Sequence, residues 1–388
     1  MTPEVPNEQR REIRFQEYVG ANDPDKLREM LTDNSLSSIR ADAAQPWGAC
    51  VGVIAAEWGH REVLALLSEF GFSVEPDAGR GVSRLRSSRT SLPEDDILSL
   101  VDVLIERGAN LSPPGWTPLH LAARGGYERV VERLLEVGVD PLADAHGSNF
   151  QPLHAALFHS DGEVFSPSSR RIVELLIERG ADVDDCWGFY PQTPLAHAAL
   201  NYRVGIARFL LERGANPNAP DEGDDTPLHK ATTHLHRLPA VSGVPASQVI
   251  EMVTLLLDAG ANPNAVNRYG VTPLLAAIPY PAYREVCRVL IARGADVNVV
   301  DASGYTPLAR VVGEGDEEFV RELLTFGAHP LAGSKDHSAI ESAVYWGNEL
   351  ILSTLLAAIP AMALNPLNDV LLHSSVHKDA AGCVALLE

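Results

Sequence analysis

The sequence predicts an all-α repeat solenoid of stacked helix pairs, and three observations support this fold class. The motif Thr117–Ala123 (TPLHLAA) recurs in modified form at residues 151, 193, 226, 272 and 306, at spacings of 34, 42, 33, 46 and 34 residues. Leucine-rich segments with helical i, i+3, i+4 spacing follow the copies. Glycine–alanine pairs then stand at residues 180, 214, 260, 294 and 327. Repeats of this kind pack only on their neighbours and build one elongated array.

Within each repeat the residues predict two helices joined by a tight turn. The threonine of the motif is a favoured residue before a helix, because its hydroxyl accepts a backbone N–H that has no partner inside the helix. The proline that follows fits the first helical position, where a missing N–H costs nothing. Paired alanines such as Ala122 and Ala123 allow neighbouring helices to approach closely. The glycine after the leucine-rich segment supplies the left-handed residue that ends the second helix.

A period near 33 residues with a T-P-L-H-x-A pattern resembles the ankyrin repeat. The resemblance covers about residues 14–388 and about eleven repeats. It implies helix–turn–helix repeats with β-hairpin loops, stacked in a curved array whose concave groove typically binds another protein. It also implies that the motif histidines, at 120, 154, 229 and 373, hydrogen-bond within and between repeats. Ankyrin repeats by themselves are not catalytic, so the resemblance implies no enzyme.

The chain is expected to divide into four segments. Residues 1–49 are expected to form a tail and a capping repeat. Residues 50–116 are expected to form two degenerate repeats. Residues 117–337 contain the clear repeats, with two long insertions at about 157–170 and 233–247. Residues 338–388 hold the C-terminal repeats, the last of them incomplete. The insertions are either tolerated surface loops, since long loops cost little free energy, or a second contact edge.

Composition limits the class of partner. The net charge of −21 argues against nucleic acid and anionic membranes and favours a protein partner with a basic surface. The four cysteines have no CxxC pair or metal-binding spacing, and the N-terminus has no apolar signal segment, so a cytoplasmic location is expected. A monomer is expected as well. No cofactor, no metal ion and no catalytic motif is expected, and three histidines at 229, 234 and 236 match no closed zinc site.

Residues that depart from the repeat pattern are the candidate partner-binding residues. Aromatic side chains at the hairpin tips are unusual there and suit protein interfaces: Trp187, Phe189, Tyr190, Tyr269 and Tyr305. A second group follows the alanine pairs and should face the groove: Trp58, Arg124, Phe158, Tyr280, Tyr345 and Trp346. The alternative for both groups is packing against the repeats themselves. The acidic candidates are Asp184, Asp185 and Asp224, which could steer a basic partner or simply serve turn geometry.

Two functions follow from these residues. The first is a non-catalytic module that binds a basic protein through the groove and the hairpin tips. The alternative is a dedicated inhibitor, such as an immunity protein that neutralises a toxin or nuclease, which the acidic hairpins and the net charge support.

Overall fold

The computed structural model describes residues 18, 21, 23–32, 63, 66, 94–106, 111–112, 116–145, 147, 149–158, 165–188, 191–233, 246–279, 284–334 and 337–359. The chain divides into two compact blocks, which are described separately. The N-terminal block contains residues 1–182 and 187–189, and the C-terminal block contains 183–186 and 190–388.

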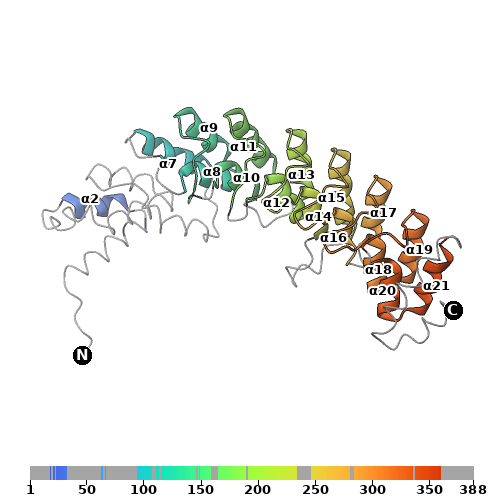
Figure 1. Cartoon of the computed structure of the whole chain (residues 1–388). Coiled ribbons are helices and arrows are strands. Elements are labelled where there is room, and N and C mark those ends of the chain that lie inside the picture. Colours follow the sequence, from blue (N-terminus) through green and yellow to red (C-terminus); the bar gives the residue numbers. More distant parts are fainter. Residues whose placement is uncertain are drawn as a thin grey trace, which may run out of the picture. The chain divides into compact units, whose positions relative to one another are not determined.

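The described part of the N-terminal block is a two-layered stack of helices (Figure 1). Its inner layer consists of α8 (Pro118–Gly125) and α10 (Pro152–Phe158), which pack on each other. Its outer layer consists of α7 (Glu94–Glu106), α9 (Glu128–Glu136) and α11 (Pro167–Glu178), with α9 in contact with both neighbours. A further helix, α2 (Pro24–Thr32), lies within the expected capping repeat.

The C-terminal block repeats the same arrangement five times (Figure 1). The inner helices are α12 (Pro194–Leu200), α14 (Pro227–Thr233), α16 (Pro273–Ala277), α18 (Pro307–Glu314) and α20 (Ala339–Trp346). The outer helices are α13 (Val204–Glu212), α15 (Ala246–Asp258), α17 (Arg284–Ala292), α19 (Glu317–Thr325) and α21 (Glu349–Ala357). Each inner helix packs on the next and on the outer helix of its own repeat. The solenoid of helix pairs that the sequence predicts is confirmed.

The motif threonines begin the inner helices as expected. Thr193 and Thr306 have extended backbones. Each hydroxyl accepts a hydrogen bond from the backbone N–H three residues later in the chain, at 3.2 Å and 3.1 Å. In the last described repeat Ser338 takes this place and exchanges hydrogen bonds with Glu341 in a capping box. Each cap contributes about 1 kcal/mol to the stability of the fold. The proline that follows the threonine fixes the backbone angle φ of the first helical residue.

The leucine of each motif anchors its repeat in the core. These leucines have no exposed surface at positions 119, 153, 195, 228, 274 and 308. Full burial of one leucine contributes roughly 1.5–3 kcal/mol relative to an exposed one. The alanines that follow are also buried, so the inner helices can approach one another closely.

In four of the described repeats the turn between inner and outer helix contains a left-handed residue. Glycine fills this position in three repeats, for example Gly126 at φ 73° and Gly315 at φ 76°. Tyr202 occupies it after α12 at φ 52°, where a side chain is strained. Its ring is 3% exposed, and its hydroxyl donates to the Ala231 carbonyl at 3.1 Å. Burial and this hydrogen bond to the next repeat offset the strain.

The loops between repeats differ from the β-hairpins that the family resemblance implies. Among the described residues they contain no strand, only single bridge residues at Trp187 and Gln192. Side chains close the turns instead: Asp301 accepts the N–H groups of Ser303 and Tyr305, both at 2.9 Å. The side chains of Asp221 and Asn267 accept the two equivalent backbone N–H groups in their own loops. Because a carboxylate or amide oxygen satisfies these N–H groups, the loop needs no strand partner.

The described ends of the two insertions belong to helices. The outer helices that follow them, α11 and α15, have 12 and 13 residues, whereas α9, α13 and α17 have 9 each. Part of the extra sequence therefore lengthens an outer helix. Residues 159–164 and 234–245 lie outside the described residues.

An asparagine ladder joins successive loops of the C-terminal block. The Asn264 side chain donates to the Gly294 carbonyl at 2.8 Å and accepts the Asp296 N–H at 2.7 Å. Asn218 and Asn298 make the same two bonds one repeat before and one repeat after. The ladder satisfies the carbonyl of the glycine that follows α15, α17 and α19, which has no partner within the helix.

We predict that Asn264→Ala lowers the free energy of unfolding by about 1 kcal/mol, because it removes both bonds of the ladder at a solvent-exposed site. Asn264→Asp keeps the acceptor and loses only the donor, so it should cost less. Urea unfolding followed by circular dichroism measures both. Equal stability of wild type and Asn264→Ala would show that water replaces the ladder without cost.

Candidate functional site

The expected histidine bonds hold the repeats together. In the N-terminal block the Thr117 N–H donates to His120 Nδ1 at 3.2 Å, so His120 Nε2 carries the proton and donates to the Phe150 carbonyl at 2.8 Å. In the C-terminal block His229 bonds in the same way to Thr226 and to the Val271 carbonyl. The links within and between repeats are therefore confirmed for His120 and His229. His154 accepts the Gln151 N–H at 2.9 Å within its own repeat, and His373 lies outside the described residues.

Aromatic side chains of the N-terminal block form a continuous row with these histidines. Phe150 lies 5.5 Å from Trp116 and 5.8 Å from His154, measured between ring centroids. The Trp187 ring then lies 4.4 Å from His154. Trp187 is half-buried, so one part of its ring packs on the repeat and another part faces solvent.

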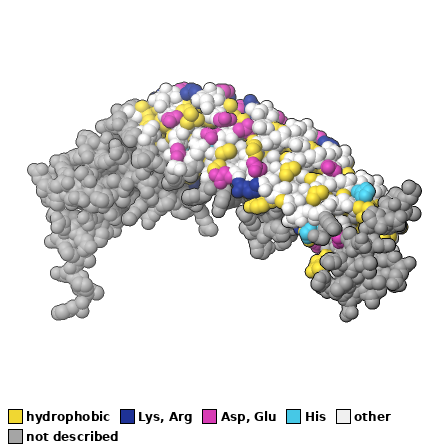
Figure 2. Space-filling model, viewed as in Figure 1, with side chains coloured by type: hydrophobic (Ala, Val, Ile, Leu, Met, Phe, Trp, Pro, Cys, Tyr) yellow, Lys and Arg dark blue, Asp and Glu magenta, His cyan; other side chains and the backbone are white. Residues whose placement is uncertain are grey.

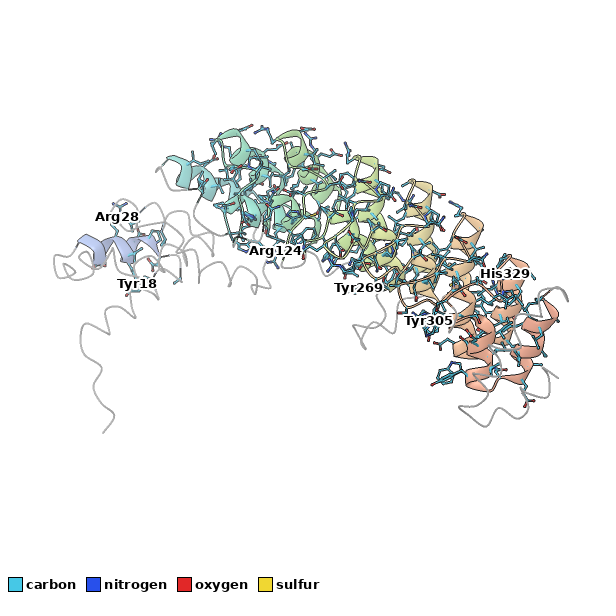
Figure 3. The ribbon with its side chains drawn as sticks, in the orientation of Figure 1. Tyr18, Arg28, Arg124, Tyr269, Tyr305 and His329 are labelled. Atoms are coloured by element: carbon cyan, nitrogen blue, oxygen red, sulfur yellow. The ribbon has the colours of Figure 1, made fainter. Side chains whose placement is uncertain are left out.

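The two tyrosine candidates on the loops have different environments, although both lie on the side of the inner helices (Figure 3). Tyr269, in the loop before α16, is 66% exposed. Tyr305, before α18, is half-buried because His337 lies 4.3 Å from its ring and the Arg310 guanidinium lies 4.6 Å above it. Tyr269 is the better placed of the two for a partner.

The groove candidates are also of two kinds. Arg124, at the end of α8, is half-buried with its guanidinium 5.6 Å from the Trp116 ring (Figure 3). Tyr345 and Trp346, at the end of α20, are 53% and 60% exposed and meet edge to face with centroids 5.1 Å apart. Trp58, Phe189, Tyr190 and Tyr280 lie outside the described residues, as does the side chain of Phe158.

Several acidic residues of the loops have structural partners. The Asp184 carboxylate accepts the Asn216 N–H at 3.0 Å. Lys230 pairs with Asp221 at 2.5 Å and with Asp225 at 2.9 Å. Burial raises the pKa of Asp225, but hydrogen bonds from Asn267 and Lys230 outweigh this effect and hold that pKa below its ordinary value. These carboxylates close turns and are not a free acidic surface.

Other acidic side chains remain on the surface. Asp224 is exposed at the tip of its loop in a left-handed conformation, at φ 59°, and Asp185 is half-buried. Figure 2 shows Asp and Glu side chains spread over the visible face of the described residues, with Lys and Arg fewer there. The surface charge is therefore negative over a broad area and not at one point.

A pocket in the C-terminal block was not foreseen from the sequence. It has a volume of about 330 Å³. Its lining consists of Ile278, Arg284, Val311, Glu314, Gly315, Asp316, Glu317 and Phe319. These residues come from the helix turns of two successive repeats. No motif marks the pocket, because its walls meet only when the repeats stack.

The described residues include no group of three or more His, Cys, Asp or Glu side chains arranged to hold a metal ion. Within the same described ranges, none of the helices combines the length and apolar character that crossing a bilayer requires.

We predict that the His229 link makes the C-terminal block sensitive to acid. Burial lowers the pKa of His229 below its ordinary value of 6.5. The stabilisation by neutral His229 is therefore complete above about pH 6.5, the pKa of histidine in the unfolded chain. As the pH falls below this value toward the lower pKa of the folded state, the stabilisation is lost. The loss is at most about 1.4 kcal/mol per pH unit.

Urea unfolding at about pH 7.5 and pH 5 tests this prediction, with His229→Gln as the matched variant. The difference in stability between wild type and His229→Gln should shrink at the lower pH. A difference that stays constant would contradict a neutral histidine in this link.

Comparisons with known proteins agree with the repeat architecture. Models described as ankyrin repeats in three copies match residues 94–185 and 164–242, a single ankyrin-repeat model matches 223–268, and a model of ankyrin repeats in many copies matches 256–310. Among relatives, the ankyrin repeat protein nuc-2 of Neurospora crassa is 38% identical over 142 residues, which is 36% of this chain and 12% of that protein.

Two further relatives match longer segments. The mouse B-cell lymphoma 3 protein homolog is 27% identical over 194 residues, or 48% of this chain and 38% of that protein. The E3 ubiquitin-protein ligase KEG of Arabidopsis thaliana is 26% identical over 289 residues, or 70% of this chain and 16% of that protein. The chain thus spans well under half the length of each of these relatives.

Proposed function

Because the chain belongs to the ankyrin-repeat family, we propose that it binds another protein through its loop tips and the exposed ends of its inner helices. Ankyrin repeats are generally non-catalytic interaction modules, and we propose no catalytic role for this chain. The ligase activity in the name of one relative is a property of that protein.

The observation that carries this proposal is the exposure of large aromatic side chains beside the inner helices. Tyr269 is 66% exposed on its loop, and Trp346 is 60% exposed at the end of α20. Aromatic rings on a surface lose water favourably when a partner covers them, and tyrosine and tryptophan dominate the binding energy of many interfaces. The asparagine ladder holds the loops in place, so their residues are positioned before a partner arrives.

We propose that the partner has a basic surface. The net charge of −21 supports this, as do carboxylates on the loops such as Glu222 and Asp224, both exposed. Complementary charge raises the rate of association and excludes acidic competitors. We also propose that the protein is a cytoplasmic monomer. The two free cysteines of the described residues, Cys186 and Cys287, support a reducing compartment.

We predict that Tyr269→Ala weakens partner binding about tenfold without changing the melting temperature, because the ring is exposed and contributes little to the core. The measurement is quantitative capture of the partner from the native cell, followed by isothermal titration with the purified partner. Phe326→Ala, which removes an exposed ring that follows α19, is the matched control. Equal losses in both variants would contradict a specific role for the loop.

Trp187→Ala should behave differently from Tyr269→Ala. Because the Trp187 ring packs 4.4 Å from His154, its loss should lower the free energy of unfolding by about 1–3 kcal/mol. Thermal unfolding of the purified variants separates the two effects. A Trp187→Ala variant with wild-type stability and weak partner binding would make Trp187 purely an interface residue.

The acidic surface also supports a second candidate, a dedicated inhibitor of a basic toxin or nuclease. Co-expression with a toxin encoded beside the gene tests it. Rescue of growth that is lost on charge reversal at Glu222 and Asp224 would support inhibition, whereas absence of rescue would leave the general binding function as the better assignment.

A further inference from the structure

The end of α20 presents an exposed pair of aromatic rings. Tyr345 and Trp346 are 53% and 60% exposed, and Leu350 in the first turn of α21 is 58% exposed. The Trp346 indole lies over the end of α18, where its nitrogen comes within 3.6 Å of the position that a Cβ on Gly313 would occupy. Contiguous exposed apolar side chains of this size mark an interaction site more often than a solvated surface.

The pocket between α16–α17 and α18–α19 lies directly beside these rings. Its lining includes Glu314 and Gly315, which follow Gly313 in the chain. The side-chain amide of Asn348, two residues after Trp346, lies 4.0 Å from the position that a Cβ on Gly315 would take. Ile278, Val311 and Phe319 supply apolar walls. Rings and pocket therefore form one continuous surface, called the α20 surface below.

Among the described residues around this surface, two carboxylates have no counter-ion. Arg284 pairs with Asp316 and with Glu318, the latter at 3.0 Å. Arg321 pairs with Glu317, and Arg288 with Glu322. Glu314 and Glu349 are exposed and form no ion pair with any other described residue. The local excess of charge is negative.

We propose that the α20 surface docks an extended basic segment of the partner protein through an arginine side chain. The inference deepens the proposed function and rests on it. A guanidinium stacks on Trp346 or Tyr345 by its flat face and pairs with the Glu314 carboxylate at its edge. The aliphatic stem of the arginine covers the apolar wall formed by Ile278, Val311 and Phe319.

Charge complementarity selects this occupant over others. A second copy of this chain carries a charge of −21 and would be repelled, and the same holds for nucleic acid and anionic lipid. An uncharged apolar segment would cover the rings but leave the Glu314 carboxylate without a cation. An arginine stacks on the rings, pairs with the carboxylate and covers the apolar wall with its aliphatic stem.

The test begins with a random heptapeptide phage library selected against the immobilised full chain at low ionic strength. The selected sequences should be enriched in arginine next to apolar residues. The strongest peptide is then synthesised, and its affinity for the full chain is measured by fluorescence anisotropy. Replacing its arginine with citrulline, which is close in shape but uncharged, should weaken binding at least about tenfold.

Variants of the chain locate the binding site. Glu314→Gln and Trp346→Ala should each weaken the peptide about five- to tenfold, with unchanged circular dichroism melting curves. Glu212→Gln changes the net charge equally on α13 and should leave affinity unchanged. Absence of arginine enrichment, or equal effects of Glu314→Gln and Glu212→Gln, would overturn the proposal.

The same variants distinguish this inference from the proposed function. If the native partner is captured and its retention is insensitive to Glu314→Gln and Trp346→Ala, the α20 surface is not its docking site and protein binding still stands. If no protein is captured while the peptide binds as described, the proposed function fails and the α20 surface remains a peptide site.

Discussion

Each repeat of this chain depends on its neighbours for burial. A motif leucine such as Leu228 or Leu274 has no exposed surface, and one helix pair is too small to enclose it. Stacking supplies the missing walls, and the histidine link fixes how one inner helix meets the next, since His229 Nε2 reaches the Val271 carbonyl at 3.0 Å. The close approach of the inner helices and the exposure of side chains beside them both depend on this stacking.

The loops show how a polar segment stays ordered without a strand ladder. Asp301 closes its own turn, and Asn264 ties the end of one outer helix to the next loop. Each such hydrogen bond contributes little to the stability of the fold. Because these bonds recur in every described repeat from α12 to α19, their contributions add up along the stack. A positioned loop loses little conformational freedom on binding, which suits it to carry an exposed tyrosine.

Aromatic residues serve both structure and surface in this chain. Trp187 and Tyr305 pack against histidines of their own blocks, whereas Tyr269 and Trp346 expose most of their rings. Acidic residues divide in the same way, because Asp184 and Asp225 have structural hydrogen bonds and Glu314 has no ion pair among the described residues. Residue type alone does not separate the two groups. What separates them is whether a neighbouring repeat supplies a partner.

The sequence by itself determined the fold class and the starts of the inner helices, and its resemblance to the ankyrin repeat indicated the role of the motif histidines. These features depend on residues close in the chain or on a regular period, such as Thr306 capping the N–H of Ala309 three residues later. Only the tertiary structure decided which aromatic rings are exposed, which acids are engaged and where a pocket forms. Those outcomes depend on contacts between residues some thirty or more positions apart, such as Asn264 with Gly294. The exact side-chain geometry at the junction of two repeats sets such contacts, and a repeating pattern does not encode it.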